Sequence, residues 1–491
     1  MRVDTLLKAI QPLRVDGNAD ATVESLAYDS RRVKPGTVFV AMKGEKVDGA
    51  AFIPKAVDSG AVAVVTESEA LTGKATQVLV RNAREALADL AGRFYNYPSA
   101  DLKMSAVTGT NGKTTTTFLI KQICDHALWR CGLIGTVQYQ IGDRILPASR
   151  TTPESLEVHQ LLSEMRDAGS KAATMEVSSH ALCQDRVRGV EFDVAVFTNL
   201  TQDHLDYHKT MEAYFQAKAG LFTGLSAQGK KAKAVINTDD RFGQRLVQML
   251  AQQTSVPVVS YGQGARSDFR ASNIRIDFNG TSYQLDANGK SYLVRLPLIG
   301  AFNVYNSLAA IAAAWVLNVG VRQSLLALAD APAVPGRLQA VAVNRLFKVF
   351  VDYAHTDDAL LNVIKTCREL KPTRLIVVFG CGGNRDRGKR PKMGAVVDAH
   401  ADFAVVTSDN PRKEDPQAII NDILPGMPGQ RYEVIVDRKE AIQYAIEVAQ
   451  PRDIVLIAGK GHETYQEFAD STIPFDDSAI AASAMADKRR S

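Results

Sequence analysis

The sequence predicts an α/β fold in three domains: a small α/β domain at 1–98, a central parallel-sheet domain of the P-loop ATPase type at 99–333, and a Rossmann-like α/β domain at 334–491. The chain of 491 residues is too long for a single hydrophobic core. Domains usually contain about 100 to 200 residues, so this length suggests three domains. Apolar strand-like runs alternate with helix-like segments throughout. Polar, turn-rich breaks at 96–101 and 331–336 supply the boundaries.

The first domain is predicted from short apolar runs that alternate with helix-like segments. We expect strands at 38–42, 61–66 and 77–80, and helices at 51–59 and 83–95. The polar segment 96–101 comes just before the next apolar run, so the first boundary lies near residue 98.

The central domain opens with a strand, a glycine-bearing loop and a helix. An apolar run at 102–107 precedes Gly109-Thr-Asn-Gly-Lys-Thr-Thr115, and a helix-like run follows at 116–128. A strict P-loop would need a glycine where the chain has Val107, so this loop is a shortened variant. A plain strand-to-helix turn is the alternative, and the lysine and threonines that follow favour a phosphate loop.

The residue types in this loop fit a nucleotide triphosphate and its metal ion. Gly109 and Gly112 allow tight turns that direct successive backbone N–H groups at an anion. Lys113 can reach the outer phosphates, and the Thr114 hydroxyl can ligate Mg²⁺. Phosphoryl transfer from ATP requires these parts.

A carboxylate after the next apolar stretch is the first metal candidate. Glu176 ends that stretch, so we expect it at a strand terminus beside the phosphate loop. Mg²⁺ prefers oxygen ligands, which makes Glu176 a candidate partner of Thr114. A solvated loop carboxylate is the alternative.

Spacing alone gives no role to His204 or Lys218. His204 lies between Asp203 and Asp206, but a lone histidine is more often a hydrogen-bonded structural residue, and imidazole matches Mg²⁺ poorly. Lys218 lies in a helix-like run at 211–221, where a surface lysine is the default expectation.

The third domain repeats one pattern, an apolar strand that ends in a polar loop. The expected strands are 347–351, 375–379, 404–407 and 454–458, and the loops that follow them are 352–355, 380–387, 409–412 and 459–463. Continuous apolar strands separated by helices indicate a parallel sheet covered on both faces, which binds ligands at the carboxyl ends of its strands. We therefore expect these loops to share one edge.

Composition and charge exclude several classes of protein. With 46% hydrophobic and 23% charged residues, the chain can fill buried cores. The net charge of +4 is small and the basic residues are interspersed with acids, so we expect no nucleic-acid partner. The start lacks the apolar core of a signal peptide, and the longest apolar stretch, at 308–317, is too short for a bilayer. We expect a cytoplasmic monomer with no membrane partner.

The cysteines argue against a disulfide framework and a zinc site, because they are scattered, odd in number and never spaced as C-x-x-C. They are Cys124, Cys131, Cys183, Cys367 and Cys381. We expect them to be reduced and mostly buried.

Six motifs, taken in order, resemble the Mur ligase family of ATP-dependent amide-bond-forming enzymes. They are Gly109-Thr-Asn-Gly-Lys-Thr114, Glu176-Val-Ser-Ser-His180, Asp203-His204, Ala301-Phe-Asn-Val-Tyr-Asn306, Pro335-Gly-Arg337 and Asp352-Tyr-Ala-His355. The match covers essentially the whole chain. Four more motifs resemble the members that add diaminopimelate as the third peptide residue of a peptidoglycan precursor: Tyr28-Asp-Ser-Arg31, Thr151-Thr-Pro153, Asp409-Asn-Pro-Arg412 and Gly459-Lys-Gly-His-Glu463.

The resemblance implies ATP and Mg²⁺ as cofactors. Residues that would contact ATP are Gly109, Thr110, Asn111, Gly112, Lys113, Thr114, Thr115, Asn306, Arg337 and Asp352. The catalytic set would be Lys113, Glu176, His204 and Lys218, and the last three would join Thr114 around the metal. Lys218 would act as a carbamate, which presents a carboxylate to Mg²⁺ where an ammonium would repel it.

A UDP-muramoyl dipeptide is the implied first substrate. Its contacts would be Tyr28, Ser30, Glu45, Lys46, Val47, Thr151, Thr152, Ser178, Gln184 and Arg186. Two positions depart from the family pattern. Arg150 replaces the usual Asn before Thr-Thr-Pro, which puts one sugar or peptide contact in doubt, and Asp357 replaces a usual Pro, which affects loop stiffness.

The implied second substrate is meso-diaminopimelate, which differs from lysine by one distal carboxylate. Its contacts would be Arg385, Asp409, Asn410, Pro411, Arg412, Gly459 and Glu463. The planar guanidinium of Arg412 can grip a carboxylate through two parallel hydrogen bonds, whereas lysine would present it with an ammonium. Arg385 would hold the second carboxylate, and Glu463 with the Gly459 carbonyl would accept from the distal ammonium.

Other interpretations stay open. An L-lysine-adding homologue would share most of these motifs. A folylpolyglutamate-type ligase shares the nucleotide loop but should lack the first domain. A dinucleotide-binding module would use Gly380-Cys-Gly-Gly383, but the third glycine position of its fingerprint is Arg385. An inactive nucleotide-binding scaffold conflicts with intact Lys113, Thr114 and Glu176.

Overall fold

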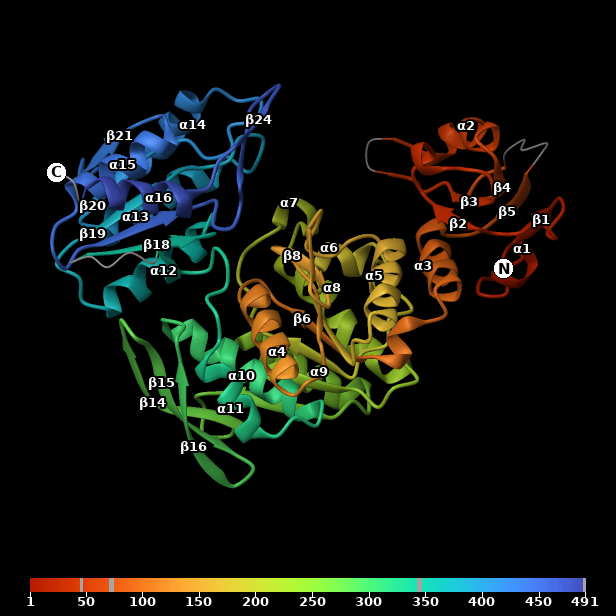
Figure 1. Cartoon of the computed structure of the whole chain (residues 1–491), viewed down its shortest axis with the longest axis horizontal. Coiled ribbons are helices and arrows are strands. Elements are labelled where there is room, and N and C mark those ends of the chain that lie inside the picture. Colours follow the sequence, from red (N-terminus) through yellow and green to blue (C-terminus); the bar gives the residue numbers. More distant parts are fainter. Residues whose placement is uncertain (45–46, 70–74, 342–346, 489–491) are drawn as a thin grey trace.

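The computed structural model describes residues 1–44, 47–69, 75–341 and 347–488. Three α/β units follow one another along the chain, each built on its own sheet (Figure 1). The amino-terminal unit lies on one side of the central unit, and the carboxyl-terminal unit lies above another part of it. This is the predicted three-domain α/β class.

The amino-terminal unit places one sheet between two layers of helices. Its elements are β1 (Arg14–Asp16), β2 (Ser25–Ala27), β3 (Thr37–Val40), β4 (Ala61–Thr66), β5 (Thr76–Leu79), α1 (Val3–Leu7), α2 (Ile53–Asp58) and α3 (Ala83–Phe94). The strand order is β1-β5-β4-β3-β2, parallel except for β1. Side chains alternate along β3, so Val38 packs toward α1 and α3 while Phe39 packs toward α2.

The central sheet is parallel in its middle and antiparallel at both edges. Its strands are β6 (Lys103–Thr108), β7 (Gly132–Ile134), β8 (Gln138–Ile141), β9 (Arg144–Pro147), β10 (Ala172–Glu176), β11 (Val194–Phe197), β12 (Lys233–Asn237), β13 (Val258–Gly262), β14 (Phe269–Asp277), β15 (Gly280–Ala287) and β16 (Lys290–Leu296). The order is β16-β15-β14-β13-β12-β11-β6-β10-β7-β8-β9. The antiparallel pairs β14 to β16 and β7 to β9 extend the parallel sheet that the sequence predicts.

Helices cover both faces of this sheet. They are α4 (Lys113–His126), α5 (Ser155–Asp167), α6 (Ser179–Cys183), α7 (Leu205–His208), α8 (Met211–Thr223), α9 (Arg241–Gln253), α10 (Ala301–Val316) and α11 (Val321–Ala329). On β6, Val107 packs toward α4, α10 and α11, whereas Ala106 packs toward α5, α8 and α9. The phosphate loop therefore lies between two packed layers.

The carboxyl-terminal unit has the expected doubly covered sheet. Its elements are β17 (Gln339–Ala340), β18 (Lys348–Asp352), β19 (Leu375–Phe379), β20 (Phe403–Val406), β21 (Tyr432–Val434), β22 (Ile454–Ala458), β23 (Tyr465–Glu467), β24 (Thr472–Pro474), α12 (Asp357–Glu369), α13 (Lys389–His400), α14 (Pro416–Ile423), α15 (Arg438–Val448) and α16 (Asp477–Asp487). The order β17-β18-β22-β19-β20-β21 is parallel except at β17. On β22, Leu456 packs toward α12 to α14 and Ile457 toward α15 and α16.

Two compositional expectations can be compared with the structure. Among the described helices, none combines the length and the apolar character needed to cross a bilayer. The cysteines are free thiols, and all are buried except Cys183.

Candidate active site

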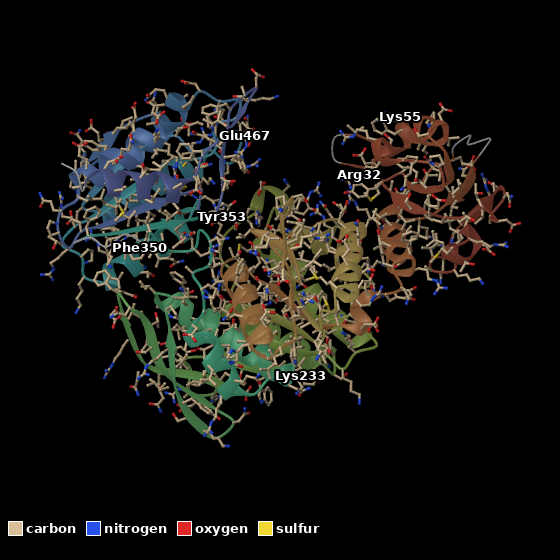
Figure 2. The ribbon with its side chains drawn as sticks, viewed as in Figure 1. Arg32, Lys55, Lys233, Phe350, Tyr353 and Glu467 are labelled. Carbon is tan, nitrogen blue, oxygen red and sulfur yellow. The ribbon has the colours of Figure 1, made fainter. Side chains whose placement is uncertain are left out.

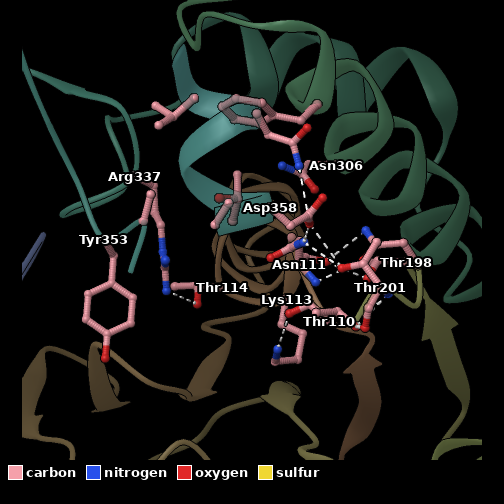
Figure 3. Close-up of a pocket in the computed structure, with 18 of the residues that line it drawn as sticks. Thr110, Asn111, Lys113, Thr114, Thr198, Thr201, Asn306, Arg337, Tyr353 and Asp358 are labelled. Carbon is pink, nitrogen blue, oxygen red and sulfur yellow. Dashed lines mark hydrogen bonds between the residues drawn. The ribbon is translucent and has the colours of Figure 1, made fainter. Parts of the chain in front are cut away.

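A cavity of about 710 Å³ lies between the central and carboxyl-terminal units (Figure 3). The phosphate loop, the first turns of α10 and the start of α12 line it. Figure 2 places Tyr353, another lining residue, where the two units meet. Of the residues predicted to contact ATP, those that line the cavity are Thr110, Asn111, Gly112, Lys113, Thr114, Thr115, Asn306, Arg337 and Asp352.

The phosphate loop depends on its two glycines. Gly109 and Gly112 have positive φ of 147° and 87°, a conformation that side chains rarely adopt. A Cβ on Gly109 would collide with Thr198 Oγ1, and one on Gly112 would collide with Asn306 Oδ1. Helix α4 starts directly after Gly112, three residues earlier than the predicted start at 116, so Lys113 lies in the first turn.

Lys113 closes over the loop. Its Nζ donates to the carbonyls of Gly109 at 3.1 Å and Thr110 at 2.9 Å. Enclosure lowers the pKa of Lys113, and the nearby carboxylates of Glu176 and Asp203 oppose that shift. A positive group is therefore held where outer phosphates would lie.

Glu176 and Thr114 form the oxygen-rich centre of the cavity. Thr114 Oγ1 donates to Glu176 Oε2 at 3.1 Å. Thr136 donates to the same carboxylate from its backbone N at 2.8 Å and from its hydroxyl at 3.0 Å. Arg337 Nη2, from the carboxyl-terminal unit, donates to Thr114 Oγ1 at 3.1 Å. The Thr114 hydroxyl and the buried Glu176 carboxylate are oxygen ligands of the kind that Mg²⁺ prefers.

Lys218 is buried, although its spacing predicts a surface lysine. Helix α8 packs this face against the sheet, and Lys218 is 1% exposed. Its Nζ donates to the Gly109 carbonyl at 2.9 Å and lies 4.8 Å from the centre of the Tyr214 ring. Burial and the charge of Lys113 hold the pKa of Lys218 well below its usual value.

His204 lines the cavity near this centre. Its Nε2 lies 3.5 Å from Asp203 Oδ2, and its ring meets the His180 ring edge-on at 4.9 Å. Burial lowers the pKa of His204 to about 4, so the ring is neutral at pH 7. Across the described ranges, no three or more His, Cys, Asp or Glu side chains form a group that could hold a metal ion. Of the predicted metal ligands, Thr114 and Glu176 contribute oxygen atoms at this centre.

Asn306 and Asp352, two of the predicted ATP contacts, are held by hydrogen bonds within the protein. Asn306 Nδ2 donates to Asn303 Oδ1 at 2.9 Å. Asp352 accepts from the backbone N of Leu338 at 2.6 Å and of Ala354 at 2.8 Å. Burial raises the pKa of Asp352, while Arg337 and these bonds counteract the shift.

A second cavity, of about 460 Å³, lies in the amino-terminal unit. Tyr28, Ser30 and Val47 line it, whereas the predicted contacts Glu45 and Lys46 lie outside the described residues. The Tyr28 hydroxyl donates to Glu157 Oε1 of α5 at 2.9 Å, which joins this unit to the central one.

The residues predicted to contact the dipeptide lie close together, and one of them, Thr151, lines the larger cavity. They are Thr151, Thr152, Ser178, Gln184 and Arg186. Thr136 Oγ1 lies 3.0 Å from Thr151 Oγ1, and Thr152 Oγ1 lies 3.4 Å from Ser178 Oγ. Arg186 donates to the Thr152 carbonyl at 2.9 Å and to Gln184 Oε1 at 2.6 Å.

The structure shows the environment of the two positions that depart from the family pattern, Arg150 and Asp357. Arg150 Nη1 donates to Glu154 Oε1 at 2.6 Å, and Arg186 Nε lies 3.1 Å from the same oxygen. Asp357 occupies the first turn of α12, where a negative charge favours the helix dipole.

The predicted amine-binding loops meet at the carboxyl ends of β19, β20 and β22. Asn410 Nδ2 donates to Glu463 Oε2 at 2.8 Å. Arg412 donates to the Gly383 carbonyl at 3.0 Å, and its Nε lies 2.8 Å from Glu467 Oε2. The remaining predicted residues differ in exposure: Arg385 is exposed, Asp409 and Pro411 are buried, and Gly459 takes a φ of 122°.

The sequence reasoning missed several residues at these sites. Lys460 is fully buried and its Nζ donates to Asn410 Oδ1 and Glu463 Oε2, both at 2.9 Å. The signal that could have identified Lys460 is its position within the motif Gly459-Lys-Gly-His-Glu463. Asp358 reaches the phosphate loop from α12, and the sequence offers no comparable signal for it.

Comparisons with known proteins give one consistent result. Residues 22–95 match the Mur ligase family, catalytic domain; residues 107–314 match the Mur ligase middle domain; and residues 336–461 match the Mur ligase, glutamate ligase domain. A UDP-N-acetylmuramoyl-L-alanyl-D-glutamate--2,6-diaminopimelate ligase from Syntrophomonas wolfei is 46% identical over 494 residues, covering 99% of this chain and 100% of its own.

Solved structures agree with these matches. A structure of an enzyme with that name is 35% identical, with a TM-score of 0.72 and full coverage of both chains. A Mycobacterium tuberculosis folylpolyglutamate synthase complexed with ADP, 20% identical with a TM-score of 0.65, has the same fold and covers 76% of this chain and 91% of its own. Because the three matched segments span most of the sequence and a 46% identical relative aligns along nearly all of it, this chain belongs to the Mur ligase family.

Proposed function

We propose that this protein is an ATP-dependent ligase that joins meso-2,6-diaminopimelate to UDP-N-acetylmuramoyl-L-alanyl-D-glutamate in peptidoglycan precursor synthesis. One observation carries the proposal: the cavity between two units brings the Thr114–Glu176 pair together with Arg337. The relatives named for this reaction align along the whole chain. Because the reaction consumes ATP, we assign it to the cytoplasm.

Each unit is assigned one substrate. Residues 1–98 would bind the uridine nucleotide in the smaller cavity, residues 99–333 would bind ATP on the phosphate loop, and residues 334–491 would bind the amino acid. The distribution of the two cavities supports this division. Bringing three substrates together supplies the orientation that water cannot.

The chemistry has two steps. The terminal carboxylate of the dipeptide attacks the γ-phosphorus, forming an acyl phosphate as ADP leaves. The neutral amine then attacks the acyl carbon, a C–N bond forms and the bond from carbon to the phosphate oxygen breaks, so that phosphate leaves with the electron pair and the nitrogen gives up a proton to solvent. The charges of Lys113 and Arg337, which both contact the phosphate loop, would stabilise both transition states.

The metal-binding residues are assigned by donor chemistry. Thr114, Glu176, His204 and carbamylated Lys218 would hold Mg²⁺, which when bound neutralises phosphate charge. A carbamate forms when a neutral amine adds CO₂ and loses a proton. The lowered pKa of Lys218 favours that neutral amine.

Amine selection is assigned to the loops around Asn410. The guanidinium of Arg412 would take the distal carboxylate of diaminopimelate, with Arg385 for the second carboxylate. Glu463 Oε2 already accepts from Lys460 and Asn410, so the distal ammonium would use the other oxygen with the Gly459 carbonyl.

The deciding experiment measures phosphate release with the muramoyl dipeptide nucleotide and ATP. Diaminopimelate, L-lysine and no amine are compared, with product mass as a second readout. We expect release and ligation with diaminopimelate. Equal rates with L-lysine would identify a lysine-adding homologue, and turnover of a folate substrate would favour the folylpolyglutamate alternative.

A further inference from the structure

Asp358 connects the carboxyl-terminal unit to the phosphate loop. It lies in the first turn of α12 and lines the larger cavity. Its Oδ2 accepts from Asn111 Nδ2 and from Thr201 Oγ1, both at 3.1 Å (Figure 3). These partners are 247 and 157 positions away in sequence, so the contact forms only when the two units meet.

The two partners of Asp358 belong to two segments of the central unit that contact each other. Asn111 belongs to the phosphate loop, and its backbone N donates to Asn199 Oδ1 at 2.9 Å. Thr201 follows β11, and its backbone N donates to Thr110 Oγ1 at 3.0 Å. Asp358 therefore binds the loop and the segment that braces it.

Two further interactions cross the same boundary. Arg337 donates to Thr114 Oγ1 at 3.1 Å, and the nearby backbone of Thr136 acts on the pKa of the His462 ring, opposing the lowering by burial. His462 directly precedes Glu463, which we assign to the amine site. The position of the amine loops relative to Glu176 thus depends on how the unit docks.

We propose that Asp358 is a positioning residue that docks the carboxyl-terminal unit on the nucleotide loop and so aligns the bound amine with the acyl phosphate. This inference rests on the function proposed above. A charged acceptor that two donors of the central unit share makes a directional contact, and a small misalignment of reacting groups lowers the rate strongly. Asp358 touches neither reacting centre in this assignment, so its effect is on alignment.

The test compares Asp358→Ala and Asp358→Asn with Asp357→Ala in the full-length enzyme. Asp357 lies in the same helical turn, and in the described part of the chain no hydrogen bond or ion pair joins it to the central unit. We expect Asp358→Ala to lower kcat roughly tenfold or more, with the KM for ATP within about twofold. Asp358→Asn keeps an acceptor oxygen and should recover part of the loss, whereas Asp357→Ala should resemble wild type.

A second readout does not require ligation. Small-angle X-ray scattering with a non-hydrolysable ATP analogue should give a larger radius of gyration for Asp358→Ala than for wild type or Asp357→Ala. If Asp358→Ala matches Asp357→Ala in both kcat and radius, or if Asp358→Asn loses as much as Asp358→Ala, the proposal is wrong. If wild type ligates no amine, the proposed function fails, while the scattering comparison still decides the docking role.

Discussion

At the residue scale, the two lysines beside Gly109 are the least ordinary feature. Lys113 and Lys218 both donate to the Gly109 carbonyl, at 3.1 and 2.9 Å. Two ammonium groups this close repel each other, and burial adds to the penalty for Lys218. Both effects lower the pKa of Lys218 and so favour its neutral amine, which is the form that reacts with CO₂.

We predict that removing CO₂ from the buffer lowers ligase activity and that bicarbonate restores it. Without the carbamate, the metal site would lose one carboxylate, and we expect a loss on the order of a hundredfold. Lys218→Arg cannot form a carbamate and should be inactive with or without bicarbonate. Activity that does not change on careful CO₂ depletion, together with an unmodified Lys218 in mass spectra, would contradict the carbamate.

We predict that Arg412→Ala raises the KM for diaminopimelate roughly 10- to 100-fold, the effect of losing a hydrogen bond from a charged group. The KM for ATP should change little, because Arg412 contacts Gly383 and Glu467 and does not line the ATP cavity. Initial rates over both substrates separate the two constants. An equal rise in both would refute the assignment.

At the scale of secondary-structure elements, the sequence predicts those strands and helices whose residue pattern lies within one segment of the chain. The strands predicted at 61–66, 375–379 and 454–458 have those bounds in the structure, because each is a short apolar run between turns. The helix predicted at 51–59 starts later, since Gly49–Phe52 forms a 3₁₀ turn first. The antiparallel edge strands of the central sheet were not predicted.

Contacts between distant segments were not readable. Lys460 meets Asn410 across 50 positions, and Asp358 meets Asn111 across 247. The spacing of residues within one helix or strand carries no information about such a pair. Motifs could therefore indicate candidate site residues, but not the residues that hold them in place. Lys218 shows the same limit, because its burial depends on packing that its neighbours in sequence do not reveal.

Arg438 is another support of this kind. It is buried at the start of α15, and it donates to both carboxylate oxygens of Asp477 at 2.8 Å. It also donates to the carbonyls of Ala458, at 3.0 Å, and Ser408, at 3.4 Å. Those carbonyls end β22 and precede the Asp409–Arg412 loop, so one guanidinium fixes two amine-binding loops on either side of β19.

We predict that Arg438→Met destabilises the protein by about 3–5 kcal/mol, because it leaves Asp477 buried without its ionic partner. The KM for diaminopimelate should rise as well, since the two loops lose a shared anchor. Urea unfolding and initial rates measure both effects. Arg431→Met, at an exposed arginine of the same unit, should change stability by less than about 0.5 kcal/mol. Comparable losses in both variants would argue against the anchor.

At the scale of the whole molecule, the joint between the amino-terminal and central units contains a buried histidine. His159 of α5 is fully buried, and its Nε2 lies 3.2 Å from the Arg188 carbonyl. A Cβ added to Gly92 of α3 would lie 3.4 Å from the His159 ring, so the two units are in contact there. Burial lowers the pKa of His159 to about 4.

We predict that this joint weakens in acid. Between the ordinary histidine pKa of about 6.5 and the folded value of about 4, the unfolded chain binds a proton that the folded chain does not. Stability therefore falls as pH drops through that window, and His159 alone accounts for about 2 kcal/mol between pH 7 and pH 5. His159→Gln keeps a donor for the Arg188 carbonyl without titrating, so its free energy of unfolding should change less over the same range. Urea unfolding at both pH values gives the two slopes, and a variant whose slope equals that of wild type would rule out His159 as the acid-sensitive group.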